Sequence, residues 1–208
     1  MHPGLPGSAV PEWRPRRLAS VATLCRAWRI MSRAAADAEG ALLDIRIDNL
    51  ESPEVIALLR EHLDSIAPTA PAQSRHALDL SGLRGPDITF WSIWDAQVLA
   101  GFGALKRLTR SHAELKSMRT AASHLRQGVA STLLQHMIQE AAARGYSRLS
   151  LETGSMVFFE PARRLYSAFG FVPCPPFGHY AADPHSVFMT LEINALATEH
   201  AAMGLPDV

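Results

Sequence analysis

Residues 114–145 read ELKSMRTAASHLRQGVASTLLQHMIQEAAARG and decide the fold. The stretch begins with a predicted strand over 114–120 and continues through a loop into a long helix that starts at Gly128. This helix ends at Gly145, and its apolar face is built from residues four positions apart: Val129, Leu133, Met137 and Ala141. A strand that leads through a loop into an amphipathic helix is typical of an α/β sheet domain.

The start of this helix is suited to binding an anion. Gly128 and Ala130 let the backbone approach a ligand closely, and no Asp or Glu occurs from Gly128 to Gln139. The first amides of a helix lack intrahelical partners and carry the positive end of its dipole. Arg126 and Gln127 add hydrogen-bond donors. The pattern predicts an exogenous anion such as a pyrophosphate, with a simple tight turn as the alternative.

The rest of the chain predicts strands and helices on both sides of this stretch. Residues 52–54, Ser-Pro-Glu, are typical of a helix start, and Pro68 ends that helix. A second helix starts at Pro161, and segment 73–85 is ambiguous, with a short helix around 76–80 as one interpretation. The other predicted strands cover 43–47, 88–94, 98–108, 148–152, 171–174 and 187–193. The order β-α-(α)-β-β-β-α-β-α-β-β indicates a mixed α/β domain.

Composition places this domain in a chain of 208 residues with balanced charge. Twenty basic and twenty acidic side chains cancel, which does not favour a nucleic-acid binder. Residues 1–40 hold six Arg against three acids, so we expect a basic, flexible extension, then a domain over 41–194 and a tail over 195–208. Two cysteines without a CxxC motif fit a reducing compartment, and no stretch predicts a membrane helix. A cytoplasmic location is therefore expected.

The loop and helix start resemble the acetyl-CoA-binding motif of the GNAT superfamily of N-acetyltransferases, Arg/Gln-x-x-Gly-x-Gly/Ala. A second motif of that family, Ala-x-x-x-Tyr-x-x-x-Gly-Phe, matches residues 162–171, which read ARRLYSAFGF. The resemblance covers residues 43–193. It implies a GNAT-like acyl-CoA N-acyltransferase fold, in which helices flank a mixed, mostly antiparallel central sheet. It also implies acetyl-CoA as co-substrate, held by Met118, Arg119, Thr120, Arg126, Gln127, Gly128, Val129, Ala130 and Ser131.

Three positions depart from the family's pattern. Leu125 stands where the family prefers Arg or Gln, and Arg126 stands where a Gly is frequent. Phe159 replaces a frequent Asn, so a polar contact to the cofactor arm is lost or is made by Ser155 instead. These departures leave the backbone amides of residues 127–131, which the resemblance implies as the binding site of the cofactor phosphates.

The resemblance further implies which residues transfer protons. An amine must lose a proton to attack a thioester. Glu114, in the context Ala-Glu-Leu, is similar to the family's glutamate base, with Glu152 as the reserve candidate and a water chain as a third alternative. The amide near Met118, where the family's strands splay, would stabilise the oxyanion, and Tyr166 takes the place of the general acid. The structural alternatives are a solvated strand-end carboxylate for Glu114 and a core tyrosine for Tyr166.

Other chemistry finds no support in the sequence. The nine histidines form no HExxH motif and no pair four residues apart, so no metal site is expected, and Ser155 lacks a GxSxG elbow. We therefore expect an enzyme that transfers an acetyl group to a primary amine of a small molecule by direct attack on the thioester. The alternatives are a catalytically weak acyl-CoA-binding sensor or partner module, and a protein-lysine acetyltransferase.

The acceptor pocket is expected near residues 76–83 and 177–184, because members of the family vary most there. The expected partner is a small-molecule amine, with no nucleic acid and no membrane. A homodimer is left open.

Overall fold

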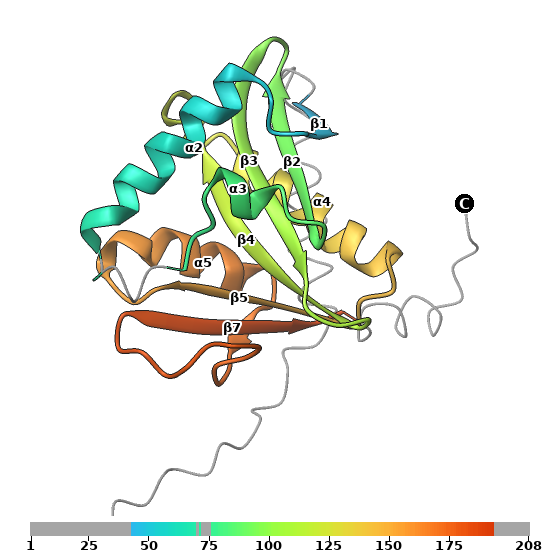
Figure 1. Ribbon diagram of the computed structural model, residues 1–208, viewed down its shortest axis with the longest axis vertical. Coiled ribbons are helices and arrows are strands. Elements are labelled where there is room, and N and C mark those ends of the chain that lie inside the picture. The colour runs from blue at the N-terminus through green and yellow to red at the C-terminus, as the bar shows by residue number, and fades with distance from the viewer. Residues whose placement is uncertain (1–42, 70, 72–75, 194–208) are drawn as a thin grey trace, which may run out of the picture. The chain divides into compact units, whose positions relative to one another are not determined.

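One sheet organises the residues that the computed structural model describes, which are 43–69, 71 and 76–193. Its strands follow the order β1-β2-β3-β4-β5-β7-β6 (Figure 1). Their bounds are Leu43–Ile47, Ile88–Asp95, Val98–Arg107, His112–Thr120, Arg148–Gly154, Val172–Pro173 and Ser186–Glu192, numbered β1 to β7 along the chain. Only the β4·β5 pair is parallel, which confirms the mixed, mostly antiparallel sheet. The predicted extension 1–40 and tail 195–208 lie outside the described residues.

Four α-helices connect the described strands: α2 (Pro53–Ile66), α3 (Leu80–Leu83), α4 (Val129–Ala143) and α5 (Glu160–Ala168). The order of helices and strands is the one that the sequence predicts. Helix α2 starts where expected, because the Ser52 hydroxyl accepts a hydrogen bond from Val55 N at 3.3 Å. Helix α4 starts at Gly128, whose φ of 84° lies in the left-handed region that glycine adopts without strain.

Two local predictions are wrong. The short helix expected around 76–80 begins only at Leu80, because Asp79 caps it by accepting from Gly82 N at 2.8 Å. The strand expected over 171–174 shrinks to Val172–Pro173, since the Phe171 amide donates to the Tyr166 carbonyl at 3.1 Å and so belongs to the end of α5. Proline at position 173 has no backbone N–H to donate, although the next amide, Cys174 N, still donates to the Phe188 carbonyl of β7 at 3.0 Å.

The helices cover the two faces of the sheet separately (Figure 1). Helices α4 and α5 pack on one face, in a core cluster that includes Leu133, Met137 and Tyr166. Helices α2 and α3 pack on the other face, in a cluster that includes Leu59, Leu83 and Phe102. Helices α2 and α3 lie over the β1–β4 part of this face. Over β5 and β7, the same face is covered by the loop that carries Phe177 and Tyr180, whose rings contact Phe188. Within the described part of the chain, no helix is long and apolar enough to cross a membrane.

Candidate active site

The two parallel strands at the centre of the sheet separate halfway along their length. Pairing of β4 with β5 ends at Leu115 opposite Leu151, although β4 continues to Thr120 and β5 to Gly154. The register of β4 against β3 also shifts between Phe102 and Ala104, and Ser117 has a φ of 51°. A bulge of this kind bends a strand away from its neighbour. The strand separation that the resemblance implies near Met118 is therefore present.

The start of α4 lies at the end of the loop that follows β4. No side chain caps this end of the helix, and its first turn contains no acidic residue. A Cβ built on Gly128 would meet no atom within 4 Å, so the space above the first turn is open. The amides of Val129, Ala130 and Ser131 begin the helix at this point. An anion fits here, because these amides and the helix dipole favour negative charge and no protein carboxylate competes.

Two of the polar side chains expected around this helix start have other partners. Gln127 donates from Nε2 to the Ser123 carbonyl at 2.9 Å. The Arg119 guanidinium lies on the opposite face of the sheet, where it reaches Glu61 Oε1 of α2 at 2.8 Å. Only the backbone of Arg119 is therefore placed to contact a ligand that lies against α4. Arg126 is exposed, with a φ of 62°.

Phe159, which departs from the family's pattern, fills space with its ring. The ring covers Gly154 so closely that a side chain at position 154 would collide with it. Ser155, the suggested substitute, is already bonded, because its hydroxyl donates to the Pro184 carbonyl at 2.8 Å. Neither residue offers the polar contact that the family's Asn would make.

Tyr166 of α5 is buried on the face that α4 and α5 cover. Its ring centroid lies 5.8 Å from that of Phe171. Burial raises the pKa of the Tyr166 hydroxyl to about 12, and no hydrogen bond joins it to another residue in the described part of the chain. The phenol is therefore protonated at neutral pH, as a proton donor must be.

The two candidate bases differ in their surroundings. Glu114 has 2% of its surface exposed, and its Oε1 accepts a hydrogen bond from the Tyr180 hydroxyl at 2.5 Å and lies 3.1 Å from Lys116 Nζ. Glu152 lies where β5 has left β4, and its Oε1 accepts from the Ser186 hydroxyl at 2.6 Å. Burial raises the pKa of Glu152, so this carboxylate takes up a proton at a pH closer to neutral than an ordinary glutamate does.

The two segments expected to shape the acceptor pocket lie together. The His76 ring centroid is 5.0 Å from that of Tyr180, and Lys116 bonds both residues. Sequence reasoning placed Tyr180 in the loop expected at the acceptor pocket without giving it a partner, and it did not identify Lys116. The alternation Glu114-Leu-Lys116 could have placed the lysine beside the glutamate on one face of the strand. Tyr180 lies 66 residues from Glu114, so no local pattern predicts its contact.

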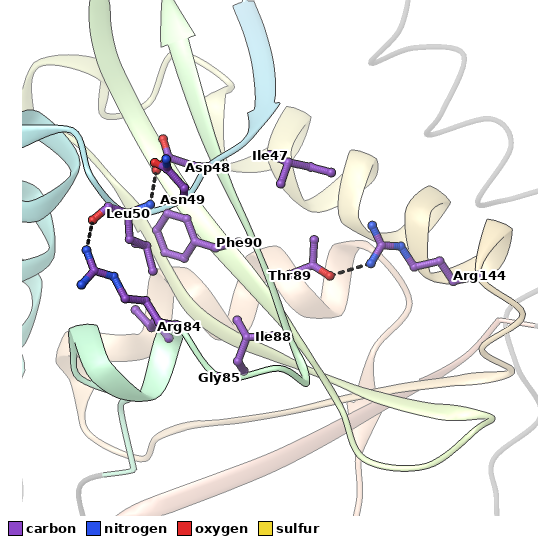
Figure 2. A pocket seen from close by; sticks show the side chains of 11 residues that line it. Ile47, Asp48, Asn49, Leu50, Arg84, Gly85, Ile88, Thr89, Phe90 and Arg144 are labelled. Atoms are coloured by element: carbon purple, nitrogen blue, oxygen red, sulfur yellow. Dashed lines mark hydrogen bonds between the residues drawn. The ribbon is translucent and has the colours of Figure 1, made fainter.

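A separate hollow of about 450 Å³ lies between the end of β1, the start of β2 and the end of α4 (Figure 2). Its polar groups are engaged: Arg84 donates to the Leu50 carbonyl at 2.7 Å, and Arg144 donates to the Thr89 hydroxyl at 2.6 Å. None of the residues expected to bind cofactor or transfer protons lines it, so we do not assign it to catalysis. Within the described ranges, no group of three His, Cys, Asp or Glu side chains could hold a metal ion.

Known proteins identify the class to which this fold and site belong. Residues 53–171 match the acetyltransferase (GNAT) family model, and the chain belongs to this family. An uncharacterized N-acetyltransferase of Bacillus subtilis, YsnE, is 58% identical over 151 residues, which are 73% of this chain and all of that protein. The protein is therefore an acetyltransferase.

Solved structures agree with this assignment. A crystal structure attributed to an acyl-CoA N-acyltransferase from Klebsiella pneumoniae has a TM-score of 0.63 and 28% identity, and the match covers 74% of this chain and 99% of that one. The PaiA N-acetyltransferase from Thermoplasma acidophilum, solved in complex with coenzyme A, has a TM-score of 0.58 and covers 73% of this chain and 99% of its own. At 18% identity, the second likeness shows the fold alone.

Proposed function

We propose that this acetyltransferase uses acetyl-CoA to acetylate a primary amine of a small molecule, by direct attack of the amine on the thioester. The open, uncapped start of α4 beside the separated strands β4 and β5 carries this proposal. The amides of residues 128–131 bind the pyrophosphate of the co-substrate, because they carry positive potential and lack helical partners. The free edge of β4 over Met118, Arg119 and Thr120 binds the rest of the co-substrate through backbone groups.

The carboxylate pair Glu114 and Glu152 receives the proton of the amine. Glu152 takes it from the amine, because it lies at the strand separation and its raised pKa suits a base. Glu114 assists Glu152 from the interior of the protein, because Glu114 is buried and its Oε1 is bonded to the Tyr180 hydroxyl. If Glu114 itself is the base, as in the family members it resembles, the proton must reach it through water or through Tyr180.

The remaining steps use one backbone group and one side chain. The nitrogen–carbon bond forms as the amine attacks, and the Met118 amide donates to the oxyanion that results. The carbon–sulfur bond then breaks, and Tyr166 gives its proton to the departing thiolate. Its pKa of about 12 lies well above neutral pH, so Tyr166 enters the reaction protonated.

The pH dependence of kcat/KM distinguishes the two carboxylates. Because burial raises the pKa of Glu152 above its ordinary value of 4.5, its base form is lost at a higher pH than that of an ordinary glutamate. We expect kcat/KM to fall about tenfold for each pH unit below that pKa, and Glu152→Gln to remove this step from the profile. The matched variant Glu114→Gln should keep it. A profile in which Glu114→Gln alone removes the step would make Glu114 the base.

The proposal is tested by free-thiol release from acetyl-CoA against a panel of primary amines and one lysine-containing peptide. A small amine should stimulate release and become acetylated. Stimulation by the peptide alone would replace the acceptor class with protein lysine. No stimulation by any member, with coenzyme A still bound, would favour the sensor module, for which the polar contacts missing at Leu125 and Phe159 are the supporting observation.

A further inference from the structure

The Lys116 ammonium joins three segments that are distant in the sequence. Its Nζ lies 3.1 Å from Glu114 Oε1 on β4, donates to the His76 carbonyl at 3.0 Å, and donates to the Tyr180 hydroxyl at 2.5 Å. Both charged side chains are buried, with exposed fractions of 8% for Lys116 and 2% for Glu114. Removing two charges from water costs free energy that their attraction scarcely returns. A pair kept under these conditions fixes an arrangement rather than adding stability.

Tyr180 is the loop residue that this pair holds. Its hydroxyl accepts from Lys116 and donates to Glu114 Oε1, so both charged groups bond to a single phenol oxygen. Its ring packs against His76 at 5.0 Å, Phe177 at 5.2 Å and Phe188 at 5.4 Å between centroids. Burial, together with the charge of Glu114, raises the pKa of Tyr180, so the hydroxyl keeps the proton that it donates.

The held segments flank the carboxylate at the strand separation. Residues 174–185 precede β7, and their last part is bonded to the residue that follows β5, because Ser155 N donates to the His185 carbonyl at 2.9 Å. The Ser186 hydroxyl, which follows directly, donates to Glu152. Lys116, His76 and Glu114 lie close enough to Glu152 for their charges to affect its ionisation. Any movement of Tyr180 or His76 therefore changes the surroundings of Glu152.

We propose that Glu114, Lys116 and Tyr180 form a clamp that positions residues 76–83 and 174–185 around the acceptor, which makes Tyr180 a positioning residue for acceptor binding. The acceptor part of this inference rests on the proposed function. The clamp acts on the amine and not on the co-substrate. It lies on the face of the sheet that α2 and the loop before β7 cover, whereas α4, whose start binds the co-substrate, packs on the other face. Loss of the clamp should therefore weaken binding of the amine and leave binding of coenzyme A as it was.

Tyr180→Phe tests the clamp, because it removes the hydroxyl and keeps the ring that packs on His76, Phe177 and Phe188. We expect amide hydrogen exchange to become at least roughly 10-fold faster in residues 76–83 and 174–185, because the hydroxyl makes two hydrogen bonds to charged groups and the loss of one such bond corresponds to roughly 10- to 100-fold. The KM for the amine should rise by a similar factor, while the KM for acetyl-CoA should stay within about twofold. Tyr146→Phe is the control, since Tyr146 belongs to neither segment.

A second variant, Glu114→Gln combined with Lys116→Met, removes both charges and should accelerate exchange in the same two segments. Unchanged exchange in both variants overturns the clamp, as does a Tyr180→Phe enzyme with the parent KM for the amine. The exchange measurement needs no acceptor, so it decides on the clamp even if no amine is acetylated. Failure of the proposed function would appear separately, as absence of amine-stimulated thiol release from the parent protein.

Discussion

Tyr166→Phe is expected to lower turnover about 10²- to 10⁴-fold, the usual contribution of a general acid, while the affinity for coenzyme A changes little. The phenol is the group that gives a proton to the departing thiolate, and phenylalanine has none to give. Burial keeps that proton on Tyr166, with a pKa of about 12, so the parent enzyme holds the acid form throughout the neutral range. Steady-state rates with a confirmed acceptor, together with calorimetric binding of coenzyme A, provide the measurement.

Packing is the competing explanation for such a loss, because Tyr166 belongs to the core beneath the sheet. Phenylalanine keeps the ring and its contact with Phe171, so unfolding should occur at nearly the parent temperature. Tyr146→Phe serves as the control, because Tyr146 also packs on this core and carries no proposed role. A Tyr166→Phe enzyme that acetylates the acceptor at the parent rate would show that Tyr166 is only a core residue.

Gly128→Glu is expected to abolish the thermal stabilisation that coenzyme A gives the parent protein. At a ligand concentration of about 100 Kd, this stabilisation is about 2.7 kcal/mol, or roughly 5–10 °C in melting temperature. The new carboxylate would enter the open space above the first turn of α4 and repel phosphate from the amides there.

The variant Gly145→Glu is the control for backbone strain. Gly145 lies past the other end of α4 with a φ of 78°, also in the left-handed region, and a Cβ there would likewise meet nothing within 4 Å. Both variants carry the same strain and the same charge, but only the first places the charge at the start of the helix. If coenzyme A stabilises Gly128→Glu as much as it stabilises Gly145→Glu, the site at the start of α4 is wrong.

Local patterns in the sequence predicted most of the fold, because the signals act over a few residues. Ser52 and Pro53 mark a helix start through a cap and a fixed φ, and Gly128 marks another through its positive φ. Both errors arose from helix capping. Asp79 delays the start of α3, and Gly170, with a φ of 88°, lets the Phe171 amide donate to the Tyr166 carbonyl at 3.1 Å, so Phe171 closes α5 instead of starting a strand.

The site was less predictable, because its key contacts join distant segments. The residue pattern predicted that α4 starts at Gly128, and the motif that contains Tyr166 lies on α5 as the predicted helix there implies. The sequence gave no sign that the Arg119 side chain would turn towards Glu61, or that Tyr180 would cover Glu114. These contacts depend on how α2 and the loop before β7 fold over the sheet, and no spacing within the sequence encodes that.

Acceptor-dependent acetyl transfer tests the central claim most directly. Acetyl-CoA is incubated with the protein, with and without the amine that gives the fastest thiol release, and thiol and acetylated amine are quantified together by a thiol reagent and mass spectrometry. We expect little release without the amine, and one acetylated amine for each thiol released when the amine is present. Thiol released at the same rate without any amine, or with no acetylated product, would contradict direct transfer to an amine.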